Sequence, residues 1–481
     1  MTGSLMDHGA SAVQHPDPDR NAASMPSSPP SRSAAGAAGL GGFVRRWLAI
    51  LRDAWVRLWF QDMSTMPLEI VRIGIGALLF INYAWATPRL FEFWTDDGWM
   101  PLWVATQWND PGQSIFFYLT AHWQLVAFHI VFLLCCLAFM VGWRTSVVKW
   151  VVYIGKLSYD YRNQVLPYGA DIVLSCLLLI LCVAPIGKAL SLDRVRAVRA
   201  AKRDNLEATP PPYTSPWAGA CIRLMQIQMA TIFFYTGVSK LKWDAWRNGD
   251  AMWVVLSSSD YYNRFYVDFF AHHYWVGVVA TYATIFIEIA YPFLIWQRAT
   301  RPYLLIAAVV LHLQIAVFLA LIHFSFVMIT GHMSFLYPDW LHRLGAWWKR
   351  KMGAMEMIYD GRCGFCVRSM AWFLAFDGLG QIKVRDFRTS PSAVVSDAQL
   401  EKALYAVLPD GRALPGFEAY RYVVLRVPGL WWLVSFFYVP VLSRLVGHPI
   451  YNWVAANRGR LSAGAIIGSK KIAIGAPRIP R

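Results

Sequence analysis

Two cysteines of the sequence are spaced for thiol–disulfide chemistry, in the segment Cys363-Gly364-Phe365-Cys366. A short β-prone run precedes them and an apolar helical stretch follows, so we predict that the pair lies at a strand-to-helix turn. Two intervening residues place both sulfur atoms within disulfide reach on the first helical turn, where the helix N-terminus stabilises the thiolate of Cys363. Cys363 would then attack a disulfide or a quinone-like acceptor, and Cys366 would resolve the mixed intermediate.

Two other interpretations of this cysteine pair are open. The pair could be half of a zinc site, but such a site needs two more ligands and the nearby sequence offers none. It could also be two packed thiols that do not react. The other five of the seven cysteines lie mainly in apolar runs, where a cysteine behaves as a small hydrophobic residue. The sequence therefore implies no structural disulfide framework.

A lysine at the end of an apolar run is the second candidate for chemistry. Lys240 lies in the segment Gly237-Val238-Ser239-Lys240-Leu241-Lys242, and Trp246 and Gly249 follow it. One interpretation is a pair of interfacial lysines whose ammonium groups reach the lipid headgroups. Alternatively, a desolvated lysine could serve as a base.

Three histidines, His312, His323 and His332, follow in the last apolar stretches. On a continuous helix the first two would be roughly 16 Å apart along the axis, which is too far to share one metal ion. We therefore predict no metal site. We expect His312 to be a polar group inside a helical bundle, because ionisable residues within a membrane usually face a cavity.

The composition is that of a polytopic membrane protein. Hydrophobic residues make up 57% of the 481 residues and charged residues only 15%, whereas a soluble domain has about 25% charged residues. The net charge of +16 would suggest nucleic acid as a partner of a soluble protein. Here the basic residues form short clusters between apolar stretches, as orientation signals in a bilayer do. We therefore expect membrane lipids, and no nucleic acid, as partners.

About eight membrane spans of roughly 20 apolar residues each are predicted. Basic clusters alternate along them with loops that are acidic and aromatic, which places both ends of the chain on the cytoplasmic side. The predicted spans lie near residues 66–87, 121–142, 146–161, 170–188, 218–238, 274–296, 303–322 and 323–340.

We expect four parts along the chain. Residues 1–42 have no aromatic residue and are rich in Ala, Ser, Pro and Gly, so they should form a disordered tail. A membrane domain over 43–345 begins with an amphipathic helix on the cytoplasmic face. Residues 352–462 follow the order strand, CxxC, helix, strand, hairpin, helix, which indicates a small α/β thioredoxin-like domain. Residues 463–481 should be a flexible basic tail.

Several motifs of the C-terminal part occur together in one known family. They are Tyr359-Asp360-Gly361 before Cys363 and Cys366, Asp386-Phe387, Gly416 with Glu418-Ala419, and Tyr451 with Ala455 and Asn457-Arg458. With these motifs, residues 355–460 resemble the DCC family of thiol–disulfide oxidoreductases. The resemblance implies a redox-active disulfide and makes Asp360 part of the signature. Physically, the Asp360 carboxylate could accept the proton of the resolving thiol or cap the following helix.

A second set of motifs lies in the membrane part. It comprises Gly237 with Lys240-Leu241, Trp246 with Gly249, Arg162-Asn163 before Gly169 and Asp171, Ser191 with Asp193, and His312 before Phe324-Ser325. With these motifs, residues 60–340 resemble the HTTM domain, which is related to vitamin K-dependent γ-glutamyl carboxylase. The resemblance implies that Lys240 is the base that deprotonates a vitamin K-like lipid hydroquinone, with Asn163, His312, Trp246 and Gly249 in support. In the carboxylase a histidine follows the asparagine, whereas Gln164 follows Asn163 here and cannot shuttle a proton.

The sequence leads to one favoured function and two alternatives. The favoured function is an integral membrane redox protein, a thiol–disulfide oxidoreductase coupled to a membrane domain that binds and oxygenates a lipid hydroquinone. The alternatives are a non-catalytic membrane scaffold that carries an oxidoreductase domain, and a γ-glutamyl carboxylase-like enzyme. We expect a bacterial-type inner (plasma) membrane location, a cytoplasmic CxxC domain, and a thiol/disulfide protein or a quinone as the partner.

Overall fold

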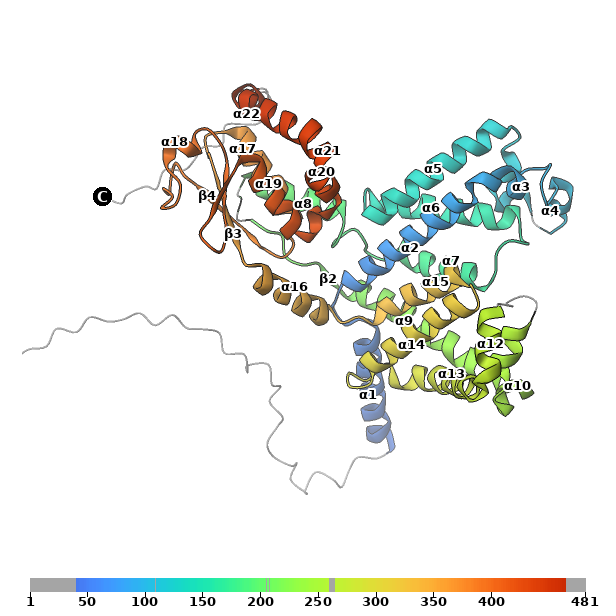
Figure 1. The fold of residues 1–481 in the computed structure, drawn as a ribbon. Coiled ribbons are helices and arrows are strands. Elements are labelled where there is room, and N and C mark those ends of the chain that lie inside the picture. Colours follow the sequence, from blue (N-terminus) through green and yellow to red (C-terminus); the bar gives the residue numbers. More distant parts are fainter. Residues whose placement is uncertain (1–39, 109, 205, 207, 259–263, 464–481) are drawn as a thin grey trace, which may run out of the picture. The chain divides into compact units, whose positions relative to one another are not determined.

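The computed structural model describes residues 40–108, 110–204, 206, 208–258 and 264–463 (Figure 1). The chain divides into two compact units, residues 1–57 and 58–481. Most of the predicted N-terminal tail and nearly all of the predicted C-terminal tail lie outside the described residues. A helix is present where the amphipathic helix was expected, as α1 (Leu40–Trp59), and its side chains from Phe43 to Leu58 are all exposed.

The larger unit contains a helix at each of the eight predicted spans. Four of the segments are long and apolar enough to cross a membrane, namely Met66–Trp94, His122–Val141, Tyr274–Leu294 and Arg301–Phe318. A bent helix pair near the C-terminus would make a fifth, so the count of about eight spans stays a prediction. The eight helices are α2 (Met66–Ala86), α5 (His122–Val141), α6 (Thr145–Arg162), α7 (Gly169–Val183), α9 (Pro216–Lys240), α13 (Tyr274–Leu294), α14 (Arg301–Phe318) and α15 (Ile322–His332).

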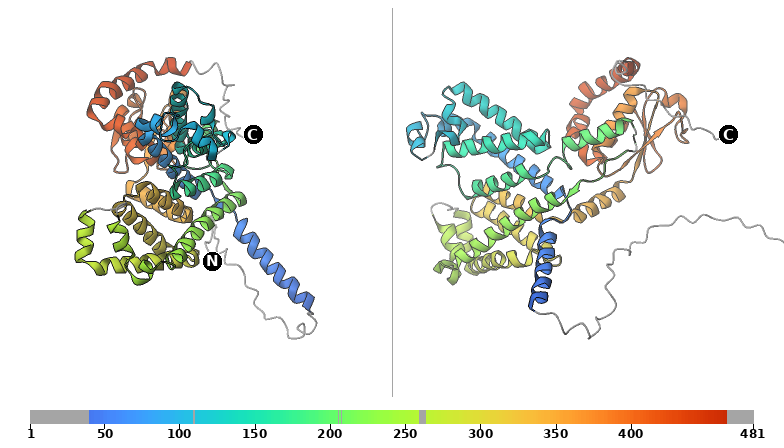
Figure 2. Two further views of the ribbon diagram at one scale, coloured as in Figure 1. Left: turned by 90° about the vertical axis from the view of Figure 1, so that its right-hand side faces the viewer. Right: turned by 180° about the vertical axis from the view of Figure 1, so that it is seen from behind.

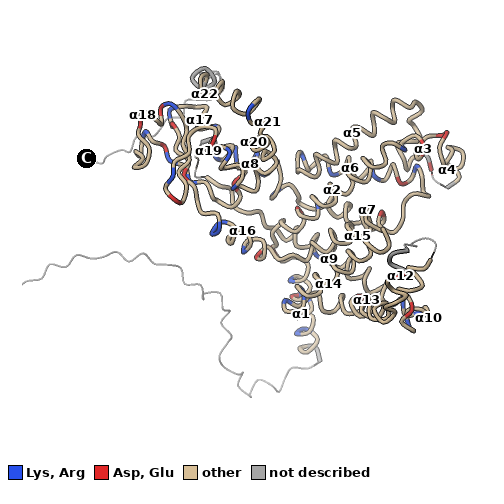
Figure 3. The backbone as a smooth tube through the Cα atoms, in the orientation of Figure 1, with Lys and Arg blue, Asp and Glu red and all other residues tan. Residues whose placement is uncertain are grey.

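Helix α2 is the centre of the bundle, because it packs against α5, α7 and α15 (Figures 1 and 2). Its Gly76 faces the backbone of Met140, and a Cβ at this position would lie only 2.8 Å from the Met140 Cα. The small residue therefore allows close approach of α2 and α5, as is common between helices in membranes. Charged residues are sparse on these helices (Figure 3).

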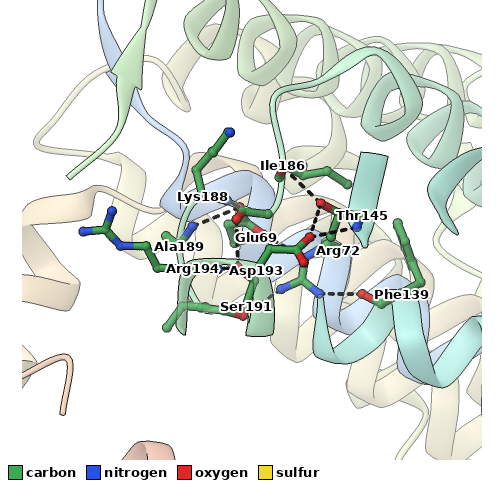
Figure 4. A network of polar contacts seen from close by, with 12 residues as sticks. Glu69, Arg72, Phe139, Thr145, Ile186, Lys188, Ala189, Ser191, Asp193 and Arg194 are labelled. Carbon is green, nitrogen blue, oxygen red and sulfur yellow. Dashed lines mark hydrogen bonds and ion pairs between the residues drawn. The ribbon is translucent and has the colours of Figure 1, made fainter. Parts of the chain in front are cut away.

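A buried arginine at the start of α2 ties three segments together (Figure 4). The Arg72 Nε atom donates to Glu69 Oε2 at 2.7 Å, and both side chains are fully buried. The Arg72 Nη1 atom donates to the carbonyl oxygens of Phe139 and Met140 at 2.5 and 2.6 Å, and Nη2 donates to that of Leu190 at 2.7 Å. These carbonyls belong to the end of α5 and to the loop after α7. Carbonyl groups at the end of a helix have no donor within the helix, and Arg72 supplies one.

The loop after α7 is held by two carboxylates of the same network. Glu69 Oε1 accepts the backbone N–H groups of Lys188 and Ala189 at 2.8 and 3.2 Å. Asp193 accepts the backbone N–H and the hydroxyl of Thr145 at 2.8 and 2.9 Å, at the start of α6. The network thus joins α2, the α5–α6 turn, the 184–191 loop and the start of α8 (Leu192–Asp204) through hydrogen bonds that span more than 40 residues of sequence.

Shorter elements connect the bundle helices. A two-residue strand pair, β1 (Met63–Ser64) and β2 (Thr214–Ser215), links the starts of α2 and α9. The other connecting elements are η2 (Thr87–Arg89), α3 (Leu90–Trp94), α4 (Leu102–Trp108), η3 (Pro111–Gln113), η4 (Ile115–Tyr118), α8 (Leu192–Asp204), α10 (Asp244–Asn248), α11 (Ala251–Ser257), α12 (Arg264–His272) and η5 (Met333–Phe335).

The C-terminal part is a small α/β domain that follows α16 (Pro338–Met352). Its sheet has the order β4-β3-β5-β6, in which β3 and β4 are parallel and the other two pairs are antiparallel. The predicted fold class, a helical membrane bundle followed by a thioredoxin-like domain, is confirmed. The elements are β3 (Met355–Tyr359), α17 (Gly364–Phe376), β4 (Ile382–Asp386), α18 (Asp397–Leu400), β5 (Tyr405–Val407), β6 (Ala413–Pro415), α19 (Gly416–Arg426), η6 (Pro428–Leu433), α20 (Val434–Tyr438), α21 (Pro440–Leu442), η7 (Ser443–Gly447) and α22 (His448–Ala463).

Loss of the Arg72 guanidinium should destabilise the bundle strongly. We expect Arg72→Met to lower the free energy of unfolding by about 3–5 kcal/mol, because Glu69 would stay buried without its partner. The measurement is a titration of the purified protein from mild detergent into SDS.

Arg196→Met is the matched control for this variant. Arg196 meets Asp193 at 3.8 Å and its side chain is 56% exposed, so its loss should cost at most about 1 kcal/mol. Equal losses in the two variants would show that the buried pair does not have the structural role assigned to it.

Candidate functional site

The cysteine pair lies after the end of β3, at the start of α17. Cys363 is the N-cap residue of α17, with extended backbone angles, and its sulfur accepts the backbone N–H of Cys366 at 3.3 Å. Both cysteines are half-buried thiols. A sulfur at a helix N-terminus faces unpaired N–H groups and the positive end of the helix dipole, which stabilise a thiolate. The arrangement is therefore suited to nucleophilic attack by Cys363.

The loop before Cys363 is held by an aspartate from the neighbouring parallel strand. Asp386 Oδ1 accepts the backbone N–H groups of Gly361 and Arg388, each at 3.0 Å. A Cβ on Gly361 would lie 2.0 Å from Asp386 Oδ2, so only glycine leaves room for this carboxylate. The close approach follows from the pairing of Tyr359 with Asp386 at the ends of β3 and β4.

Asp360 belongs to the same loop and faces an arginine. Its carboxylate accepts the backbone N–H of Arg362 at 3.0 Å and pairs with Arg388 at 3.2 Å. Arg388 also pairs with Glu401 at 3.0 Å. The hydrogen bonds that Arg388 donates to the Asp360 carboxylate raise the pKa of Arg388, which therefore stays charged. The N-cap position that was considered for Asp360 is occupied by Cys363.

An apolar pocket of about 270 Å³ lies beside the second cysteine. Cys366 lines it together with aromatic and aliphatic side chains of α17, α19 and the helices after α19. Tyr420 also lines it, and burial, followed by the charges of Tyr451 and the two cysteines, raises the pKa of Tyr420. This phenol therefore stays neutral. The lining residues include Phe365, Phe373, Phe417, Phe437, Ile450 and Val454.

Lys240, the candidate base of the membrane domain, has a carboxylate partner. Its Nζ donates to Glu288 Oε1 and Oε2 at 2.8 and 2.7 Å, and it lies 5.0 Å from the ring centroid of Trp246. Gly249 ends α10, just after Trp246, with a φ of 88°. Lys240 and Glu288 come from the end of α9 and the middle of α13. Glu288 was absent from the predicted site, although an acidic residue inside a predicted span is itself a signal of function.

His312 and His332 form a second polar group in the membrane domain. Their rings lie 5.5 Å apart. His332 Nδ1 shares a 2.7 Å hydrogen bond with the Tyr291 hydroxyl. In the described part of the chain, three buried nitrogen atoms of these residues have no hydrogen-bond partner. They are Nδ1 and Nε2 of His312 and Nε2 of His332. Buried polar atoms without partners are rare and are expected where a ligand or water binds.

Asn163 lies in a different polar environment, on a cavity of about 720 Å³ that Lys240 does not line. Its amide donates to the Phe93 carbonyl at 2.8 Å, and its oxygen accepts the Val165 N–H at 3.1 Å. Sequence reasoning overlooked Lys156, which is buried beside this cavity, and the partner Asp160 that lines it. Their spacing of four residues within a predicted span was the available signal.

The residues that the structure describes form no candidate metal centre. Among them, no group of three or more His, Cys, Asp or Glu side chains is placed to hold an ion. Of the residues predicted for the membrane site, Lys240 and Trp246 are in contact, His312 lies beside His332, and Asn163 lines another cavity.

Comparison with known families finds two matches. A model of the HTTM domain matches residues 60–340, and a model of the DCC1-like thiol-disulfide oxidoreductases matches residues 357–463. The two lie in the order that the sequence motifs indicated. No curated protein and no solved structure matches the chain.

Gly361→Ala should disturb the thiol loop. The added methyl group would collide with Asp386, so we expect a loss of about 1–3 kcal/mol in the stability of the C-terminal domain. Thiol reactivity should fall as the loop shifts. The measurements are urea unfolding, followed by hydrogen exchange of β3 and α17, and the rate of Cys363 alkylation.

Gly364→Ala provides the control within the same motif. Its Cβ would meet only the end of the Arg368 side chain, at 3.6 Å, so stability and alkylation should remain near those of the parent protein. If both variants behave alike, the Asp386 contact does not position the loop.

Proposed function

Because the chain belongs to the HTTM domain family and ends in a DCC1-like thiol-disulfide oxidoreductase domain, we propose that it is a membrane-bound oxidoreductase that uses Cys363 and Cys366. The observation that carries this proposal is the position of the Cys363 sulfur at the N-terminus of α17, where it accepts the N–H of Cys366. The partner would be a thiol/disulfide protein or a quinone. The basic end of α16, just before this domain, favours a cytoplasmic position.

The reduction of a substrate disulfide would proceed in two exchanges. The Cys363 thiolate attacks one sulfur, the substrate S–S bond breaks, and the leaving thiolate takes a proton. Cys366 then loses its proton and attacks the Cys363 sulfur, which releases the second substrate thiol. The substrate gains two electrons and two protons, and the domain keeps the Cys363–Cys366 disulfide. The reverse sequence oxidises a substrate dithiol.

Replacement of the two cysteines should give different results. Cys363→Ser should abolish exchange with a small disulfide such as glutathione disulfide, because the nucleophile is lost. Cys366→Ser should instead accumulate a mixed disulfide on Cys363, since nothing resolves it. Intact-protein mass spectrometry after acid quenching measures both products.

Cys176→Ser tests whether other thiols contribute. Cys176 is exposed on α7 in the membrane domain, and its replacement should leave the exchange rate unchanged. A mixed disulfide that accumulates equally in Cys363→Ser and in Cys366→Ser would exclude Cys363 as the nucleophile.

A second candidate function concerns the membrane domain, and the partnerless nitrogens of His312 favour it. A lipid hydroquinone, when bound, would supply the hydroxyl that is deprotonated and the ring that reacts with oxygen. The Lys240 ammonium group would first give a proton to Glu288, which contacts this nitrogen with both oxygens, and the neutral amine would then take the hydroxyl proton at Nζ. His312 offers a hydrogen bond to orient the ring. Full carboxylase activity is less well supported, because Gln164 follows Asn163.

The double variant Lys240→Met with Glu288→Gln removes both charges without leaving one of them buried and alone. We expect it to lose hydroquinone-dependent oxygen uptake by about 100-fold or more, which is the scale of general-base catalysis. Crosslinking by a photoreactive naphthoquinone, which reports binding, should persist. Lys242→Met, two residues away and exposed, should behave as the parent protein. Oxygen uptake that is the same in the double variant and in the parent protein would exclude the Lys240–Glu288 pair as the base, and a parent protein without uptake or crosslinking would indicate a membrane domain that serves as a scaffold.

A further inference from the structure

The helices after α19 form a bent hairpin with a large exposed apolar face. The segments Pro428–Tyr438 and Pro440–Asn457 together are as apolar as a membrane span, but they meet at an angle of 78°. Leu445 is 72% exposed, Val441 63% and Trp432 61%. Trp453, Ile450, Trp431, Leu442 and Val439 also lie exposed on this hairpin. An apolar surface of this extent on a folded domain marks an interaction site.

The inner face of the hairpin is already covered by its own domain. The Phe417 ring stacks on Phe437 at 5.2 Å between centroids and lies 4.1 Å from the His448 ring. Tyr451 packs against Tyr420, and the Tyr438 hydroxyl donates to the Arg421 carbonyl at 3.0 Å. The outer face therefore remains for a partner outside the domain.

Helix α16 extends the apolar face and adds positive charge to it. The Trp348 ring lies 5.5 Å from that of Trp431, and its indole N–H donates to the Arg426 carbonyl at 3.1 Å. Trp347 and Leu344 are exposed on the same helix. Its last turn carries Lys349, Arg350 and Lys351, which are seen as the basic end of α16 in Figure 3. Tryptophans beside basic residues are typical of helices at a lipid–water interface.

The chain also keeps this domain close to the bilayer. Phe335, buried in the core of the membrane domain, lies three residues before the start of α16. Helix α16 has 15 residues, which corresponds to roughly 22 Å, and β3 begins three residues after it. This short connection holds the C-terminal domain near the membrane domain.

We propose that the outer face of the Pro428–Asn457 hairpin, together with α16, lies in the interface of the bilayer and binds anionic lipid headgroups. The tryptophans would sit at headgroup level, and Val441 and Leu445 would enter the upper acyl region. The bend of 78° and the covered inner face favour this position over a transmembrane one. The basic residues of α16 match the charge of the anionic headgroups.

The proposal has a consequence for the thiol site, which rests on the proposed function. Ile450 is exposed on the hairpin and also lines the pocket beside Cys366. The mouth of this pocket would therefore open at the membrane surface. The preferred substrates would be thiols or disulfides that are themselves located at that surface.

Depth-dependent fluorescence quenching tests the position of the hairpin. The full-length protein would carry a fluorescent unnatural amino acid at Leu445 or at Val441, in nanodiscs that contain anionic lipid. The control position is Lys383, which is exposed on the edge strand β4. Lipids with a nitroxide near the headgroup should quench both hairpin positions at least about twofold more than lipids with a nitroxide near the chain end, as the depth of an interfacial helix requires. Lys383 should show no lipid quenching.

Each other result would overturn the proposal. Stronger quenching by the deep nitroxide would indicate a membrane span. Quenching only by aqueous iodide would indicate a solvated face, and protection from both quenchers would indicate a protein partner. Two label positions are used so that a single misfolded variant, detected by thermal unfolding, does not decide the result. Mixed-disulfide trapping in Cys366→Ser tests the proposed function separately, since quenching does not depend on the thiols.

Discussion

The buried guanidinium group of Arg72 constrains the packing of the membrane domain more than any other group described above. Arg72 is fully buried, and its charge is compensated by Glu69, one turn away on the same helix. Its remaining N–H groups bind carbonyls at the end of α5 and in the loop after α7. An unsatisfied polar group in an apolar medium costs several kcal/mol. The three segments can therefore separate only if the arginine loses its acceptors.

The two candidate reaction centres are built on different principles. The thiol site depends on one local turn, in which β3, Gly361 and the start of α17 bring the Cys363 sulfur to a helix N-terminus. The Lys240 site depends on side chains from separate helices, since Glu288 lies 48 residues away along the chain. In the described residues, the pocket beside Cys366 is lined by the C-terminal domain, and Glu288 and Trp246, the partners of Lys240, belong to the membrane domain. Chemical coupling between them would therefore need a carrier that moves, such as a quinone.

This difference explains what could be predicted from the sequence. Helix positions and the strand-to-helix cysteine pair follow from apolar runs and turn residues, which are local signals, and the structure has these elements within a few residues of the expected places. The partners of Arg72 and Lys240 depend on which helices pack together. The spacing of residues along one helix does not predict which helices those are. Asn163 illustrates the limit. A motif grouped it with Lys240, yet its amide binds the Phe93 carbonyl beside another cavity.

The C-terminal hairpin shows how composition can mislead when the fold is unknown. From sequence, this region is predicted only to be helical and to belong to the thioredoxin-like domain. Phe417 and Tyr420 cover one side of the hairpin, so its apolar residues are shared between a domain core and an outer face. A helix that uses one face for packing cannot be surrounded by lipid, and one that exposes Leu445 and Trp432 is poorly suited to water alone. The interface between the two media satisfies both faces, and it is also the place where a thiol site would meet substrates held at a membrane.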